Sequence, residues 1–148
     1  MKEKSFKVAE IEVSYKPALG RKPIIKSSYD AYIELKPFYP DETIELQEQF
    51  IVMYLNRANR VIGIYPIFKG GISSVSVDLR LIFSVALKIV ASSIVLSHNH
   101  PSGNLQPSSA DEELTRKIKS AAKLLDISLL DHIIITKEDY FSFEDKGL

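Results

Sequence analysis

The sequence predicts an α/β domain in which helices pack against a mixed β-sheet. Two apolar, β-rich runs in the first half, 49–56 and 60–68, are separated by the turn-forming residues NRAN and are typical of a β-hairpin. In the second half, strand-like and helix-like patterns alternate, as in a sheet whose strands are connected through helices. With 148 residues, 45% of them hydrophobic, the chain is long enough for one globular domain with a substantial core.

Residues 1–43 are expected to extend this domain with a strand and a short helix. Apolar and polar residues partly alternate over 7–15, which predicts an edge or half-buried strand. A loop is then indicated by Pro17, Gly20 and Pro23. Residues 27–38 fit a short helix that is capped by one of its two initial serines and ends near Pro37.

The elements after the hairpin follow from changes in hydrophobic period. Gly70-Gly71 ends the hairpin pattern, and residues 72–78 predict a third strand of the same group. Residues 79–93 carry apolar side chains at helical spacing, whereas 94–98 is the short, continuous apolar run of a strand covered on both faces. The remaining predicted elements are a helix at 108–126, an interior strand at 129–136 and a further strand at 140–145.

Composition excludes several classes of function. The formal net charge is zero, from 19 Lys and Arg against 19 Asp and Glu, which argues against the broad basic surface typical of nucleic-acid binding. A local basic patch over 16–26 still leaves direct contact with nucleic acid conceivable. The chain has no cysteine, so disulfides, thiolate-bound zinc and a cysteine nucleophile are excluded. Without a secretory signal or a run of about 20 apolar residues, a cytoplasmic protein away from the membrane is expected.

The segment LSHNHPSGNLQPSSAD, residues 96–111, contains the residues most suited to chemistry. His98 and His100 alternate at the end of a predicted strand, so both rings can face one ion. A turn-rich loop then leads to a helix whose first turn holds Asp111, and two histidines with one carboxylate form an open zinc set with a place for water. The alternative is structural: a core His98, a loop His100 and an Asp111 that caps the helix together with Ser108.

The joint spacing is more specific than any of its parts. His98-x-His100, seven residues, Ser108, two residues and Asp111 resemble the metal motif of the JAMM (MPN+/JAB) metalloproteases. The surrounding sequence, with LLDHIII and YFSFEDKGL further on, resembles the bacterial RadC-like branch over about residues 44–148. The resemblance implies a JAB/MPN, cytidine-deaminase-like architecture and Zn²⁺ held by His98, His100 and Asp111.

The same resemblance implies roles for other residues. Glu48 matches the glutamate that serves as general acid and base, with Glu42 and Glu45 close enough in sequence to remain alternatives. The Ser108 hydroxyl is expected to donate to the developing oxyanion while its oxygen caps the helix. His132 is expected to support the site rather than to bind the metal, since two histidines and one aspartate already complete the set.

Several functions stay open on these residues. The leading hypothesis is metal-dependent amide hydrolysis of a peptide or protein conjugate, and the alternative is the DNA repair or recombination role associated with the RadC name. A zinc nucleoside deaminase is excluded because that chemistry requires cysteine ligands. A protein with an unused site is a third hypothesis, although the ligand set is complete. Manganese or iron would also suit imidazole and carboxylate ligands. The oligomeric state is left open.

Overall fold

The computed structural model describes residues 8–20, 22–69 and 77–148, and these form a mixed sheet of five strands. Its order is β2-β1-β3-β4-β5, in which β3 and β4 are parallel and the other neighbours are antiparallel. The strands are β1 (Gln49–Leu55), β2 (Val61–Lys69), β3 (Ser93–Asn99), β4 (Ser128–Ile135) and β5 (Tyr140–Ser142). The α/β class predicted from the sequence is therefore confirmed.

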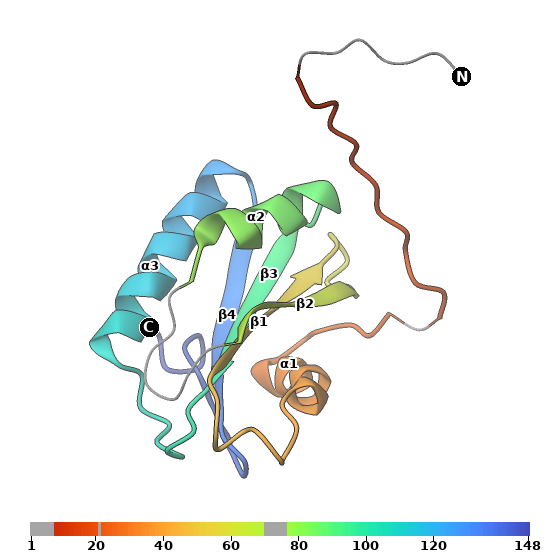
Figure 1. Ribbon diagram of the computed structural model, residues 1–148. Helices are drawn as coiled ribbons and strands as arrows, with labels where there is room; N and C mark the ends of the chain where they lie inside the picture. The colour runs from red at the N-terminus through yellow and green to blue at the C-terminus, as the bar shows by residue number, and fades with distance from the viewer. Residues whose placement is uncertain (1–7, 21, 70–76) are drawn as a thin grey trace.

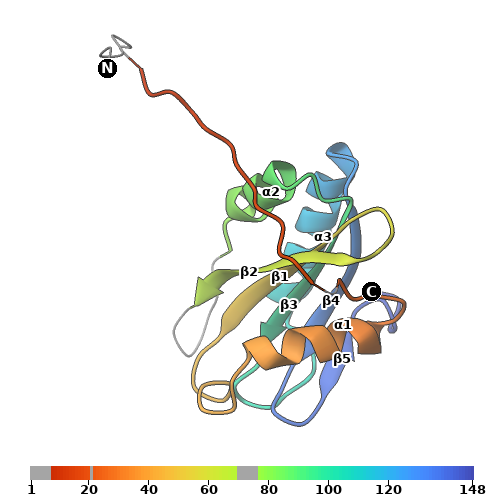
Figure 2. The same cartoon turned by 90° about the vertical axis from the view of Figure 1, so that its right-hand side faces the viewer.

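Helices cover both faces of the sheet. On one face lie α2 (Leu79–Lys88) and α3 (Ser109–Leu124), and on the other lie α1 (Ser28–Leu35) and the short 3₁₀ helix η1 (Lys36–Phe38) (Figures 1 and 2). Alternate side chains of β1 enter two separate cores, with Phe50 and Val52 in the core under α2 and α3 and Ile51 and Met53 in the core under α1. Burial on both faces explains why the central strands are continuously apolar.

Within the described residues, α1, α2 and α3 each begin at a side-chain cap. The side chains of Ser27, Asp78 and Ser108 accept hydrogen bonds from backbone N–H groups in the first turns of α1, α2 and α3, respectively. The helix predicted over 79–93 ends earlier, at Lys88, because Val90 takes a left-handed conformation with φ of 54°. The Ala91 N–H then donates back to the Ala86 carbonyl, which closes the last turn.

The connection from β3 through α3 to β4 positions the candidate site. The carboxyl ends of parallel strands meet at the same edge of a sheet, and a helix that follows such a strand begins close to that edge. His98 pairs with Phe50 at the beginning of β1 and with Ile134 near the end of β4. The start of β1, which lies far upstream in the sequence, therefore meets the end of β3 and the start of α3.

The sequence prediction was wrong for the N-terminal strand. Residues 8–15 belong to no strand and extend away from the sheet (Figure 1). Ile11 and Val13 are 86% and 70% exposed, so the alternating pattern is not used to bury an apolar face, which is what stabilises a strand. At the end of this segment, the Tyr15 hydroxyl donates a hydrogen bond to the Ile62 carbonyl of β2.

Two other predicted strands also differ in extent. The strand expected over 140–145 is limited to β5, because the backbone turns at Glu144, whose N–H donates to the Asp131 carboxylate. Residues 72–76 of the strand expected over 72–78, like Gly70-Gly71, lie outside the described residues. Within the described part of the chain, no helix combines the length and hydrophobicity needed to cross a bilayer.

Candidate metal centre

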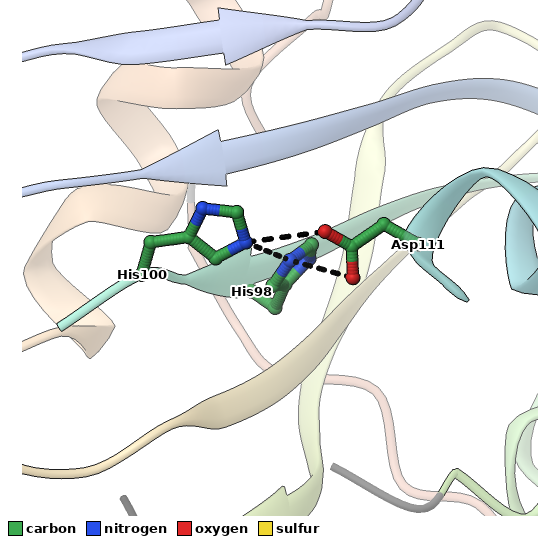
Figure 3. Close-up of side chains that lie close together, drawn as sticks. All are labelled: His98, His100 and Asp111. Atoms are coloured by element: carbon green, nitrogen blue, oxygen red, sulfur yellow. Dashed lines mark hydrogen bonds and ion pairs between the residues drawn. The ribbon is translucent and has the colours of Figure 1, made fainter. Parts of the chain in front are cut away.

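The end of β3 brings two imidazoles to one face of the sheet. His98 is the penultimate residue of β3 and is 4% exposed, and His100 follows the strand directly and is partly buried. Asn99 separates them, so strand alternation directs both rings to the same side. That side is the one covered by α3, as Figure 3 shows for the rings and the neighbouring start of α3.

The loop after β3 fixes the ring of His100. Its Nδ1 lies 2.6 Å from the Asn104 carbonyl oxygen, which can only accept, so Nδ1 carries the hydrogen and Nε2 keeps its lone pair. The loop folds back through a turn in which the Gly103 N–H donates to the His100 carbonyl. Gly103 has φ of 83°, a left-handed conformation that suits glycine. This turn places the Asn104 carbonyl beside Nδ1 of His100.

Asp111 is held in place by the first turn of α3. The Ser108 N–H donates to its Oδ2 at 2.9 Å, and its own N–H donates to the Ser108 Oγ at 3.0 Å. This reciprocal pair is a capping box. The structural interpretation of Asp111 is thus correct, but it does not exclude ligation, because the cap leaves the carboxylate facing the imidazoles.

The three side chains point at a common centre (Figure 3). The Nε2 atoms of His98 and His100 are 3.0 Å apart, and they lie 3.4 Å and 3.2 Å from the two carboxylate oxygens of Asp111. Among the described residues, these three form a group whose potential ligand atoms all lie within 4.8 Å of one another. The structure thus brings together the three metal ligands predicted from the sequence, in a group that could bind a metal ion.

The donor set fits a divalent ion. Nitrogens bound at about 2.0–2.1 Å to one tetrahedral zinc ion are about 3.3 Å from each other, close to the separation of the two imidazoles. The lone pair of His100 and the carboxylate of Asp111 both converge on the centre, and such acceptors repel one another unless a cation or a proton lies between them. Two nitrogens and one carboxylate suit zinc, manganese or iron.

Protons compete with a metal for this centre. Burial is the largest influence on Asp111 and by itself raises its pKa, but hydrogen bonds with the His100 and His98 rings hold the carboxyl pKa well below its usual range. Burial likewise lowers the pKa of His100, yet the contacts with Asp111 and the Asn104 carbonyl outweigh it and raise this pKa. Positive charge is therefore favoured between the three side chains.

Glu48 lies beside this centre, at the residue before β1. Burial raises its pKa above the usual range, while the imidazoles of His98 and His100 act to lower it and the Asp111 carboxylate acts to raise it. The glutamate is thus within electrostatic reach of all three cluster residues. It is partly exposed and does not belong to the group of potential ligands.

The alternative glutamates are less suited to act at the centre. Glu42 and Glu45 are both exposed, on the turns that lead to β1. Glu45 forms an ion pair with Lys137 at 3.7 Å, on the loop after β4. Their surroundings favour Glu48 as the acid–base candidate.

Asn99 fixes the backbone on either side of Glu48. Its side-chain Nδ2 donates to the carbonyls of Ile44 and Gln47 at 2.7 Å and 2.8 Å, and its Oδ1 accepts from the Gln49 N–H at 2.7 Å. Asn99 is completely buried. Its place between two histidines at the end of a strand directs its side chain to the face opposite the two rings.

His132 lies behind His98 and supports it. Its Nε2 is 2.8 Å from the Nδ1 of His98, on the side of that ring away from the centre. The ring of His132 is stacked on Phe143, with centroids 4.7 Å apart, and meets Phe50 edge-on. This position agrees with a supporting residue rather than a ligand.

The fold and the cluster together define a class of protein: an α/β domain with a candidate metal centre of two histidines and one aspartate, and a glutamate beside it. The chain belongs to the RadC-like JAB domain family, whose sequence model matches residues 25–148. This match includes α1 as well as the sheet and the cluster.

Bacterial relatives support the same assignment. A UPF0758 protein of Flavobacterium johnsoniae is 44% identical over 124 residues, which cover 84% of this chain and 53% of the relative. A UPF0758 protein of Porphyromonas gingivalis is 42% identical over 131 residues, or 88% of this chain and 56% of the relative. One of Chlorobaculum parvum is 39% identical over 124 residues, 84% of this chain and 54% of the relative. The chain thus spans about half the length of these relatives.

Proposed function

We propose that the protein is a zinc-dependent hydrolase that cleaves amide bonds in a peptide or protein conjugate. The observation that carries this proposal is the convergence of His98, His100 and Asp111 on one point, with Glu48 beside it. Three protein ligands leave a fourth position on a tetrahedral ion, which distinguishes catalytic zinc sites from structural ones.

Zinc, when bound, supplies Lewis acidity that polarises a carbonyl group and makes water a better nucleophile at neutral pH. Glu48 accepts a proton from the attacking water and later delivers it to the leaving nitrogen. The raised pKa of Glu48 suits the first step, because it makes the carboxylate a stronger base toward water.

Ser108 stabilises the negative charge that develops on the substrate carbonyl oxygen. The helix cap uses the Ser108 oxygen as an acceptor for the Asp111 N–H, so the cap does not consume the hydroxyl hydrogen. Ser108 is exposed at the start of α3 and can turn this hydrogen toward a bound substrate. Removal of a single donor of this kind from other hydrolases lowers the rate about 10²–10³-fold.

The test is hydrolysis of a peptide library by the zinc-loaded chain, followed by mass spectrometry. Wild-type protein is expected to cleave a subset of peptides, and Glu48→Gln is expected to lose about 10²–10⁴ in rate while it retains zinc. His100→Ala is expected to lose both zinc and activity. Cleavage that persists in both variants, or a zinc-loaded wild type that cleaves neither peptides nor isopeptide-linked conjugates, would contradict the proposal.

A further inference from the structure

The tautomer of His98 determines whether its Nε2 can bind a metal, and this tautomer depends on the hydrogen-bond partner of Nδ1. A neutral imidazole carries one hydrogen, so His98 offers the Nε2 lone pair to the centre only when its hydrogen is on Nδ1. Nδ1 lies 2.8 Å from the Nε2 of His132, which must then act as the acceptor. The tautomer of His98 therefore depends on the tautomer of His132.

Thr115 determines the tautomer of His132. The Thr115 hydroxyl donates its single hydrogen to the Asp111 backbone carbonyl at 2.7 Å, since a carbonyl can only accept. The same hydroxyl oxygen lies 2.6 Å from Nδ1 of His132 and can only accept there. His132 must then carry its hydrogen on Nδ1, which leaves its Nε2 free to accept from His98.

Burial prevents solvent from replacing these partners. His132 is 1% exposed and Thr115 is 8% exposed, so the hydrogen bonds that these two side chains form are made within the protein. The stacking of Phe143 on His132 also limits rotation of the ring. A reversed order of hydrogens would direct the Thr115 hydrogen away from the Asp111 carbonyl and place a hydrogen on Nε2 of His98.

We propose that Thr115 and His132 are positioning residues that fix the tautomer of His98 and so prepare its Nε2 to bind the metal. The chain of hydrogen bonds runs from the backbone of Asp111 on α3 through β4 to His98 on β3, and it links the two elements that carry the cluster. This inference rests on the metal site of the proposed function but not on the hydrolytic reaction.

The experiment compares Thr115→Val, which keeps the shape of the side chain and removes the hydroxyl, with Thr115→Ser, which keeps the hydroxyl. Zinc affinity is measured by competition with a chromophoric chelator. Thr115→Val is expected to bind zinc about 10–100-fold more weakly than wild type, the range found when outer partners of metal ligands are removed. Thr115→Ser is expected to restore the affinity to within a few-fold.

A spectroscopic measurement tests the tautomer itself. Two-dimensional ¹⁵N–¹H spectra of the imidazoles are expected to place the His132 hydrogen on Nδ1 in the zinc-loaded wild type and in Thr115→Ser. In metal-free Thr115→Val the hydrogen is expected to move to Nε2. A second variant, His132→Phe, keeps a ring against Phe143 but removes the acceptor, and it is expected to lose zinc affinity to a similar extent.

The outcomes separate this inference from the proposed hydrolysis. Zinc affinity of Thr115→Val and His132→Phe equal to that of wild type, or a His132 hydrogen on Nε2 in wild type, would overturn the positioning role. If the zinc affinities of wild type and variants fall in the expected order but the wild type cleaves no peptide, only the proposed hydrolysis is contradicted. A folded wild type that binds no zinc would overturn both.

Discussion

The Nε2 atoms of His98 and His100 lie 3.0 Å apart at the end of β3. Each ring is held from behind by a partner at its Nδ1, namely His132 for His98 and the Asn104 carbonyl for His100. The protein therefore prepares the two nitrogens for a common ion before any ion is bound. Pre-organisation of this kind reduces the reorganisation that binding requires, and it leads to separate predictions for the ligands, the acid–base residue and the buried polar groups.

Asp111→Asn separates capping from ligation. Asparagine can still accept a hydrogen bond at its side-chain oxygen and cap the helix start, but it lacks the negative charge that binds the metal. The metal-free protein is expected to keep the helix cap and stay folded, with a lower free energy of unfolding because the charge that the imidazoles stabilise is lost, while zinc affinity falls at least about 10²-fold. Chelator competition and urea unfolding measure the two effects. Glu113→Gln, in the same exposed turn of α3, is the control and should change neither.

Asn99→Ala is expected to reduce hydrolysis without removing the metal. The substitution leaves backbone groups on both sides of Glu48 without partners, which destabilises the fold by about 1–3 kcal/mol and releases the glutamate from its position. Hydrogen exchange at the Gln49 amide should accelerate, zinc affinity should stay within a few-fold, and the rate should approach that of Glu48→Gln.

The hairpin turn offers a matched control for Asn99. Asn56 also uses its side chain to hold backbone, accepting from the N–H groups of Ala58 and Arg60. Asn56→Ala should therefore lose stability without an effect on hydrolysis by the remaining folded protein. Equal rates in Asn99→Ala and wild type would show that Asn99 has a structural role alone.

Asp131 gives a pH dependence that is separate from the metal centre. Burial raises its pKa and the nearby Asp145 adds to this, although hydrogen bonds from Ser142 and from two backbone N–H groups act in the opposite direction. Because the folded protein holds this proton more tightly than the unfolded chain, the Asp131 contribution to stability falls as pH rises from the ordinary value of 3.8 through the raised pKa. Asp131→Asn should remove that decrease, as measured by urea unfolding between pH 4 and 7. A parallel pH dependence in the two proteins would be inconsistent with the raised pKa.

The parts that were predictable from the sequence are those set by local periodicity. Strand alternation placed His98 and His100 on one face, and the helix start placed Asp111 opposite them, so a short segment contained the whole cluster. The hairpin and the helix α3 were predictable for the same reason. The N-terminal strand was not, because an alternating pattern specifies a strand only where a neighbour pairs with it.

The supporting hydrogen bonds depend on contacts between distant segments. Asn99 holds a backbone segment about 50 residues upstream, and Thr115 meets His132 only because of the register between α3 and β4. No spacing along the chain encodes these pairs. An asparagine between two histidines and a histidine in an apolar strand are the signals that would have directed attention to them, since a buried polar side chain requires a partner.

Zinc content per chain is the measurement that tests the metal centre most directly. It would be determined by elemental analysis after zinc is supplied and excess removed, for wild type and for His100→Ala. About one zinc is expected per wild-type chain, as for a single three-ligand site, and little in the variant. A folded wild type that retains no zinc, or a variant that retains as much as wild type, would contradict the assignment of His98, His100 and Asp111 as metal ligands.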